Sequence, residues 1–156
     1  MDYFQAVVVD YLRADRAVFV NTECCIQLNP GKNPDTSGPH WYCDALTVNF
    51  RERLISLCEV TYSQSLDALI RRLTGWSESW PQLRAALVRD CCLPGDWHVQ
   101  PCIFIPAERQ AVLTAKLSKI PAIASGNSQM PLPTVVHLES VLPWKYPSWN
   151  RVPGNQ

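Results

Sequence analysis

Hydrophobic side chains recur along this chain with two spacings, one typical of helices and one typical of strands. Residues 3–13 carry apolar side chains at helical spacing, which predicts an amphipathic helix. The segments 16–28, 41–50 and 54–62 are rich in apolar residues, many of them β-branched or aromatic, which predicts three successive strands. Between the first two strands, a loop is predicted over 29–40, where three prolines and two glycines fall.

The following part of the chain alternates helices with a strand. A helix follows the third strand and is predicted to end at Gly75, and Pro81 suits the first turn of another helix. The segment 97–105 reads as a strand, and its internal Pro101 favours an edge position or a bulge. A last helix is expected over 106–120, with proline at its start and lysines at its end.

This order of elements predicts a mixed α/β (α+β) domain over residues 1–120. Six of the thirteen prolines fall after that point, so residues 121–156 are expected to form a Pro-rich C-terminal extension with one short strand or helix. Trp144 and Trp149 lie in its proline-rich end. They are candidates for docking onto a partner subunit, with folding back onto the same domain as the alternative.

Composition narrows the class of protein. With 156 residues, 47% of them hydrophobic and 18% charged, the chain is typical of a globular protein. A net charge of zero argues against a broadly basic nucleic-acid coat protein, because phosphate binding draws on Lys and Arg. No run of eighteen apolar residues and no signal peptide are visible, which predicts no membrane association. Seven cysteines without zinc-like spacing favour reduced thiols in a cytoplasmic protein.

Two acidic residues interrupt the apolar pattern of the second and third strands, Asp44 and Glu59. An acid among apolar neighbours is costly to bury unless it has a partner. Strand alternation places Glu59 and Thr61 on one face, and Asp44 can face the same side if the register allows. Convergent carboxylates repel each other unless they are protonated or bridged by a cation such as Mg²⁺ or Mn²⁺. The pair therefore suggests a metal site able to activate water against a phosphate.

Each acid also has a simpler interpretation. Asp44 can be a strand-end acid whose carboxylate is hydrogen-bonded to the backbone. Glu59 can be the cross-strand partner of an arginine such as Arg51 or Arg53.

The succession of helix, strand, strand with Asp44, strand with Glu59, and helix resembles the core of the PD-(D/E)xK nuclease superfamily over roughly residues 3–120. The resemblance implies a restriction-endonuclease-like core, a four-stranded mixed sheet flanked by helices. It implies that Asp44 and Glu59 are ligands of Mg²⁺ (or Mn²⁺). It also implies phosphodiester hydrolysis in nucleic acid, most naturally DNA.

The motif departs from the family pattern at Thr61, where the family has a lysine that is thought to orient the water and offset phosphate charge. Gln64, Arg71 or Arg72, from the segment and helix that follow, are candidates to replace that lysine. Arg71 and Arg72 are also candidates for binding nucleic acid, with a solvated charged face as the alternative. The family often has an acid on its first helix, for which Asp10 is the nearest candidate.

Two functions follow from these observations. The first is a metal-dependent nuclease. The second is a non-catalytic binding or assembly module that keeps the nuclease-like fold and predicts a stable protein partner or a homo-oligomer. The threonine at position 61, the zero net charge and the aromatic tail favour the second.

Overall fold

The computed structural model describes residues 2–30, 38–120 and 129–141. Its elements, in chain order, are α1 (Tyr3–Arg13), β1 (Val18–Gln27), β2 (His40–Asn49), β3 (Leu54–Val60), α2 (Asp67–Glu78), α3 (Trp80–Cys91), β4 (His98–Ile105), the short 3-10 helix η1 (Ala107–Arg109), α4 (Gln110–Leu117), β5 (Thr134–His137) and the 3-10 helix η2 (Leu138–Ser140). The mixed α/β class expected from the sequence is confirmed.

The strands form one mixed sheet in the order β1-β2-β3-β4-β5. The first three pair antiparallel, whereas β3, β4 and β5 run parallel to one another. The prediction of a four-stranded sheet is wrong, because β5 pairs with β4 from Cys102–Thr134 to Ile105–His137. This strand comes from the Pro-rich segment beyond residue 120. Four residues among prolines are too few to show a strand period in the sequence.

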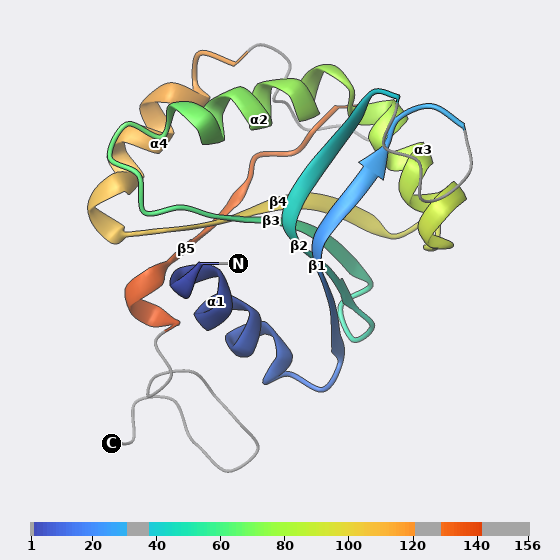
Figure 1. Ribbon diagram of the computed structural model, residues 1–156, viewed down its shortest axis with the longest axis horizontal. Helices are drawn as coiled ribbons and strands as arrows, with labels where there is room; N and C mark the ends of the chain where they lie inside the picture. The colour runs from blue at the N-terminus through green and yellow to red at the C-terminus, as the bar shows by residue number, and fades with distance from the viewer. Residues whose placement is uncertain (1, 31–37, 121–128, 142–156) are drawn as a thin grey trace.

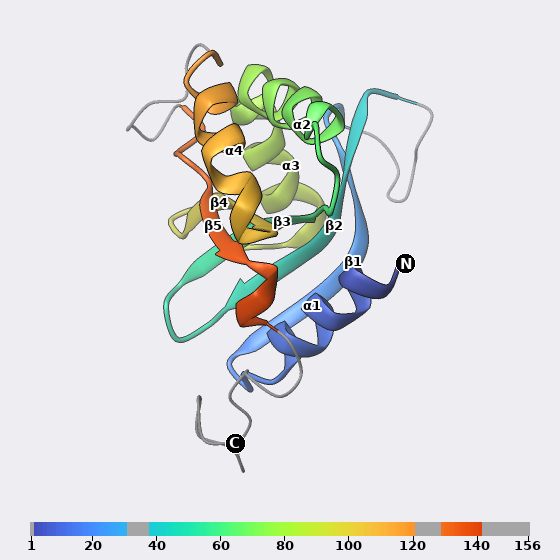
Figure 2. The same ribbon diagram turned by 90° about the vertical axis from the view of Figure 1, so that its left-hand side faces the viewer.

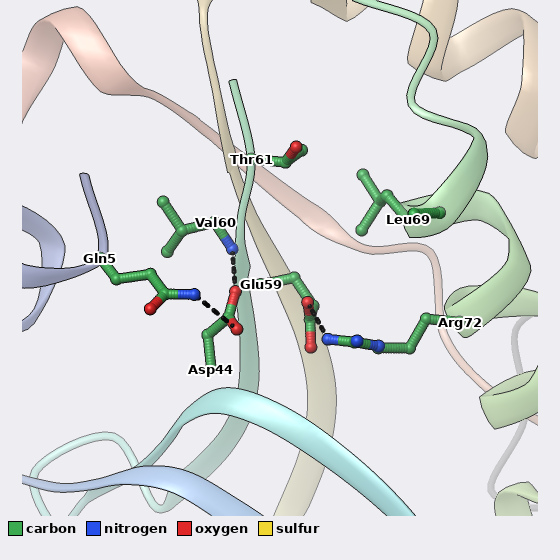
Figure 3. A pocket seen from close by; sticks show the side chains of 8 residues that line it. Gln5, Asp44, Glu59, Val60, Thr61, Leu69 and Arg72 are labelled. Carbon is green, nitrogen blue, oxygen red and sulfur yellow. Dashed lines mark hydrogen bonds and ion pairs between the residues drawn. The ribbon is translucent and has the colours of Figure 1, made fainter. Parts of the chain in front are cut away.

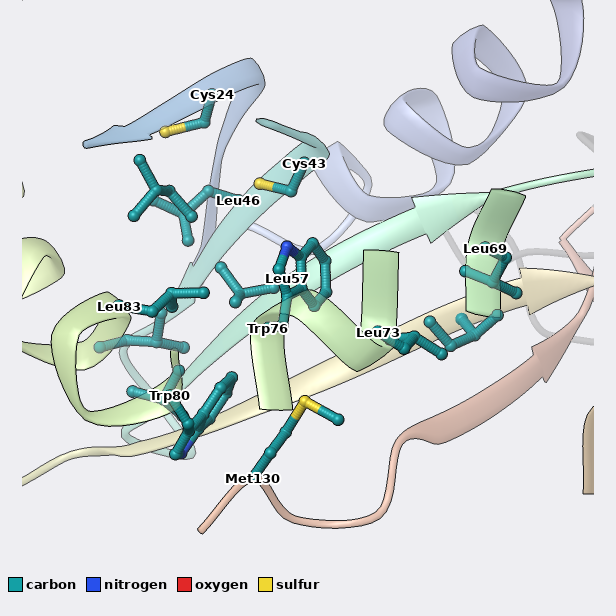
Figure 4. Close-up of a cluster of buried hydrophobic side chains, with 14 of the residues drawn as sticks. Cys24, Cys43, Leu46, Leu57, Leu69, Leu73, Trp76, Trp80, Leu83 and Met130 are labelled. Carbon is teal, nitrogen blue, oxygen red and sulfur yellow. The ribbon is translucent and has the colours of Figure 1, made fainter. Parts of the chain in front are cut away.

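The sheet is covered on both faces. In Figures 1 and 2, α1 and η2 lie on one face and α2, α3 and α4 lie on the other. Figure 4 shows the larger core, in which Trp76 of α2 and Trp80 of α3 are completely enclosed. Burying an apolar side chain of this kind stabilises the fold by about 1.5–3 kcal/mol. The smaller core packs Val7 and Val8 of α1 against Cys58 and Phe104 of the sheet.

The positions of Pro101 and Gly75 in the structure differ from those expected from the sequence. Pro101 lies in β4, which is an interior strand, but it precedes the stretch of β4 that pairs with β5. Gly75 does not end α2, which continues to Glu78. A Cβ on Gly75 would lie 2.1 Å from Cζ2 of Trp41, so the glycine lets the Trp41 ring pack directly on the helix. That contact places α2 over the start of β2, where Trp41 lies.

All seven cysteines are free thiols. Within the described ranges, no helix is long and apolar enough to cross a membrane.

Candidate functional site

A hollow of about 200 Å³ opens at one end of the sheet, where β3 ends and where α1 and α2 begin. Figure 3 shows the side chains that line it, with α1 on one side and α2 on the other. The lining residues are Gln5, Asp44, Glu59, Val60, Thr61, Ala68, Leu69 and Arg72. The structure therefore brings together Asp44, Glu59, Thr61 and Arg72, four of the residues selected from the sequence. We call this region of the molecule the acid end.

Asp44 is held by two hydrogen bonds, one to each carboxylate oxygen. The side-chain Nε2 of Gln5 donates to Oδ1 at 2.9 Å, and the backbone N–H of Val60 donates to Oδ2 at 2.8 Å. The β2–β3 pairing ends at Ala45–Cys58, one residue short of Asp44. The carboxylate thus takes a backbone donor of β3 just beyond the paired stretch, and its orientation is fixed from two directions.

A local distortion of the sheet accompanies this placement. Glu23 of β1 has a φ of 51°, and the pairing passes from Thr22–Ala45 to Cys24–Cys43 without a pair at Asp44. Cys43 and Ala45 would share one face of a regular strand. Instead Cys43 packs in the core under α2 and α3, whereas Ala45 packs in the core under α1. The alternation of β2 side chains between the two faces of the sheet is therefore interrupted at Asp44.

Glu59 is buried, with 5% of its surface exposed, and it faces α2. Its Oε2 accepts a hydrogen bond from the Arg72 guanidinium at 2.6 Å, which is also an ion pair. Its Oε1 is buried and has no hydrogen-bond partner among the described residues. A buried carboxylate oxygen without a donor is unfavourable by about 1–3 kcal/mol. The site therefore contains one oxygen that a proton or a cation would stabilise.

The two acids shift each other's titration. Burial and, next, the negative charge of Asp44 raise the pKa of Glu59, and with Arg72 acting in the opposite direction the pKa lies at about 7. Burial also raises the pKa of Asp44, against the hydrogen bond from Val60. Two carboxyl groups of this kind share a proton, or accept a cation in its place, near neutral pH.

The remaining candidates from the sequence lie in different places. The Thr61 hydroxyl lines the hollow and accepts a hydrogen bond from the Ser63 N–H at 3.1 Å. Gln64 is exposed between β3 and α2 and is not among the lining residues. Arg71 is exposed and lines an adjoining hollow. Asp10 is exposed and does not line the site. Trp144 and Trp149 lie outside the described residues.

Gln5 is the site residue that the sequence reading missed. Asp2 caps α1 by accepting from the Gln5 N–H at 2.8 Å, and Gln5 Oε1 accepts from the Asp2 N–H at 3.2 Å. This reciprocal capping box fixes the Gln5 side chain, so that its Nε2 is directed to Asp44. The D-x-x-Q spacing at the start of the helix is a signal that points to the capping box, although not to the contact with Asp44.

Asp44 and Glu59 are the side chains of the acid end that could hold a hard divalent cation. Among the described residues, no group of three or more His, Cys, Asp or Glu side chains is arranged to hold a metal. Mg²⁺ keeps several of its waters and is commonly held by one or two carboxylates together with substrate phosphates. Asp44 and Glu59 supply two carboxylates, and Glu59 Oε1 is an oxygen without a donor. Mg²⁺ or Mn²⁺ therefore suits this site better than Zn²⁺, which favours His and Cys ligands.

No model of a known protein family matches this chain, and no curated protein matches it.

Proposed function

We propose that this protein is a metal-dependent phosphodiesterase of the PD-(D/E)xK type that acts on nucleic acid. The observation that carries the proposal is the convergence of Asp44 and Glu59 in one hollow, with an undonated carboxylate oxygen and the Arg72 guanidinium beside them. The element order from α1 to β4 agrees with the restriction-endonuclease-like core that the resemblance implies. The mixed sheet also agrees, with β5 as an addition at its edge.

In this proposal Asp44 and Glu59 hold Mg²⁺ or Mn²⁺. Such a cation, when bound, activates a water for attack on phosphorus and stabilises the charge that develops on the phosphate. Gln5 and the Val60 N–H keep the Asp44 carboxylate in one orientation, because each donates to a different oxygen. Glu59 must be ionised to act as a ligand, and Arg72 favours that ionised form.

Arg72 is the residue that takes the place of the family's lysine. Thr61 stands at the lysine position but carries no charge, and its hydroxyl is used locally by the Ser63 N–H. A guanidinium has five N–H donors, and its Nη1 is the atom bonded to Glu59. Since 35% of the Arg72 side chain is exposed, its other donors are available to a phosphate oxygen. Gln64, which is exposed outside the hollow, keeps a catalytic role only as a prediction.

The test is cleavage of end-labelled DNA and RNA, single-stranded and duplex, by the purified chain with Mg²⁺ or Mn²⁺. We expect cleavage that EDTA abolishes. Asp44→Asn should lower the rate more than about 100-fold, because loss of a metal ligand exceeds the 10–100-fold effect typical of its outer-shell partners. Asp15→Asn is the matched control, since Asp15 pairs with Arg51 at the opposite end of the sheet. Wild type and Asp44→Asn that are equally inactive on every substrate would refute the proposal.

A second function is favoured by one contact. The ion pair between Arg72 and Glu59 already compensates one acid without any metal, as a non-catalytic binding or assembly module would require. That alternative predicts a stable protein partner or a homo-oligomer. Size-exclusion chromatography with light scattering measures the oligomer, and a chain ending after Val141 tests whether Trp144 and Trp149 maintain it.

A further inference from the structure

Exposed aromatic rings lie directly beside the acid end. Tyr62 follows Thr61 at the end of β3, and its ring stacks on Phe4 of α1 with centroids 4.7 Å apart and planes 6° from parallel. The ring of Tyr3 packs edge-on against the ring of Phe4, with centroids 5.4 Å apart. Tyr62 is 55% exposed and Tyr3 is 67% exposed. Phe4 therefore supports Tyr62 from one side and leaves more than half of that residue open to solvent.

A second hollow adjoins the acid end on the side of α2. Its volume is about 240 Å³, and Trp41, Ala68, Arg71 and Arg72 line it. Ala68 and Arg72 line the acid hollow as well, so the two hollows are neighbours that share these residues as a wall. The ring of Trp41 is fixed in its place by the close packing on Gly75.

Arg71 differs from the paired arginines of this protein. Arg51, Arg72 and Arg89 each form an ion pair with an acid, at 2.8, 2.6 and 2.6 Å. Within the ranges that the structure describes, the Arg71 side chain has no ion pair or hydrogen bond. Asp67, four residues before it on the same helix, senses the charge of Arg71, but the ion pair of Asp67 is with Lys116 at 2.6 Å. The guanidinium of Arg71 therefore keeps its hydrogen-bond donors for a phosphate.

These features follow one another across the end of the sheet. Gln5 lies on the side of α1 and Arg72 lies on the side of α2, with Asp44 and Glu59 between them (Figure 3). Phe4, which precedes Gln5 in α1, carries the stacked ring of Tyr62. The hollow of Trp41 and Arg71 adjoins the acid hollow at Arg72. We propose that Tyr62, the acid hollow and the Arg71–Trp41 hollow form one binding track for single-stranded nucleic acid.

In this track an unpaired base stacks on Tyr62 and a phosphate lies at Arg71, with the scissile phosphate at the acids; this last placement rests on the proposed function. Unpaired bases expose their π-faces, and proteins hold them by stacking on aromatic side chains beside a backbone-binding cation. A base inside a duplex presents no free face to Tyr62. The zero net charge of the chain also suits a track with few cations better than a broad duplex-binding surface.

The test is fluorescence anisotropy of labelled oligothymidylate and of a blunt oligothymidylate–oligoadenylate duplex of the same length. The full chain is used in EDTA, so that binding is measured without cleavage. We expect the single strand to bind more tightly than the duplex. Tyr62→Ala should weaken binding of the single strand by roughly 5- to 150-fold, the range for one base–aromatic stack. Tyr62→Phe should bind as wild type does, because the stacking ring remains.

Arg71→Ala should reduce the slope of log affinity against log salt concentration by about 0.7, the value for one phosphate contact on a single strand. Phe50→Ala and Arg53→Ala are matched controls, because they remove an exposed ring and an exposed cation at the far end of β3. We expect both to bind as wild type does. Circular dichroism of each variant establishes that it is folded.

Equal binding of duplex and single strand, or wild-type affinity of Tyr62→Ala, would overturn the track. Its failure can be distinguished from failure of the proposed function. If the chain binds single strands in the expected pattern but never cleaves them, the binding track is supported and the proposed hydrolysis is refuted. If the chain cleaves nucleic acid and neither Tyr62→Ala nor Arg71→Ala changes the rate, the proposed hydrolysis is supported and the binding track is refuted.

Discussion

The two ends of the sheet each carry a hollow, and their linings differ. At the acid end, about 200 Å³ is lined by two carboxylates, an arginine and an amide as well as apolar groups. At the opposite end, which we call the aromatic end, about 450 Å³ is lined by Phe19, Val48, Phe50 and Leu93. None of the described side chains that line the larger hollow could transfer a proton or hold a cation. Volume therefore does not locate the chemistry of this protein, and the lining does.

The energetic cost of the two ends also differs. Phe19 and Phe50 are 64% and 56% exposed and meet edge-on at 5.4 Å, an arrangement that leaves no polar group unsatisfied. At the acid end, Glu59 is buried next to a second acid, and one of its oxygens has no donor among the described residues. A fold keeps such an arrangement at the expense of stability. We infer that the acid end is kept for what it binds.

The largest expected effect concerns the pH dependence of stability. The pKa of Glu59 is raised in the folded state to about 7, from the usual 4.5. The folded protein therefore binds more protons than the unfolded chain between these values, and its stability falls as pH rises through that window. Across the whole window the loss amounts to about 3 kcal/mol. Urea unfolding of the wild type from pH 5 to pH 8 measures it.

Glu59→Gln should remove most of this pH dependence, since glutamine cannot ionise. Glu52→Gln is the matched control, because Glu52 is exposed in the turn before β3 at the aromatic end. Its stability curve should follow that of the wild type. A free energy of unfolding of the wild type that is constant from pH 5 to pH 8 would contradict a raised pKa of Glu59 in the folded state.

The next effect concerns the packing that holds α2 over the acid end. Gly75→Ala places a Cβ 2.1 Å from Trp41 Cζ2, and the rigid ring must move. Overpacking of this kind typically destabilises a protein by about 1–3 kcal/mol, and the gain of about 1 kcal/mol in helix propensity leaves a net loss of up to about 2 kcal/mol. Thermal unfolding of Gly75→Ala measures the difference.

Gly95→Ala provides the comparison for that substitution. Its added Cβ would meet Val88 Cγ2 at 3.6 Å, an ordinary contact, so we expect little change in stability. If Gly75→Ala is as stable as Gly95→Ala, the Trp41 contact does not determine the position of α2.

The smallest effect belongs to the aromatic end. Replacing Phe19 and Phe50 by serine should change the free energy of unfolding by about 0.5 kcal/mol or less, as is usual for exposed positions. Nucleic-acid cleavage should stay at the wild-type rate, because the described residues that line this hollow are all apolar. A loss of cleavage in this double variant would show that the aromatic end contributes to the function, against this prediction.

The sequence was informative where a single local pattern determines the structure. The helix at residues 3–13 and the two strands that bear Asp44 and Glu59 lie within a few residues of their predicted positions. Strand alternation correctly separates Glu59, which faces α2, from Cys58, which packs under α1. These predictions depend on periods of two and of 3.6 residues, which a strand or a helix shows along its own length.

Other features depend on contacts between distant segments. Gly75 reads as a helix stop, and only the approach of Trp41 explains why it lies within α2. Gln5 joins the site because a helix cap directs it to a strand 39 residues away. The interrupted alternation at Asp44 is linked to the positive φ of Glu23 on the neighbouring strand. No period within one segment contains this information.

The central claim is that Asp44 and Glu59 together bind a divalent cation. Isothermal titration calorimetry with Mn²⁺ at pH 8, where Glu59 is mostly ionised, measures this directly. We predict a saturable site that weakens at pH 6, where a proton competes for Glu59. It should disappear in the Asp44→Asn, Glu59→Gln double variant and persist in Asp15→Asn. Equal Mn²⁺ binding by the wild type and the folded double variant, or no saturable binding by the wild type, would contradict the account.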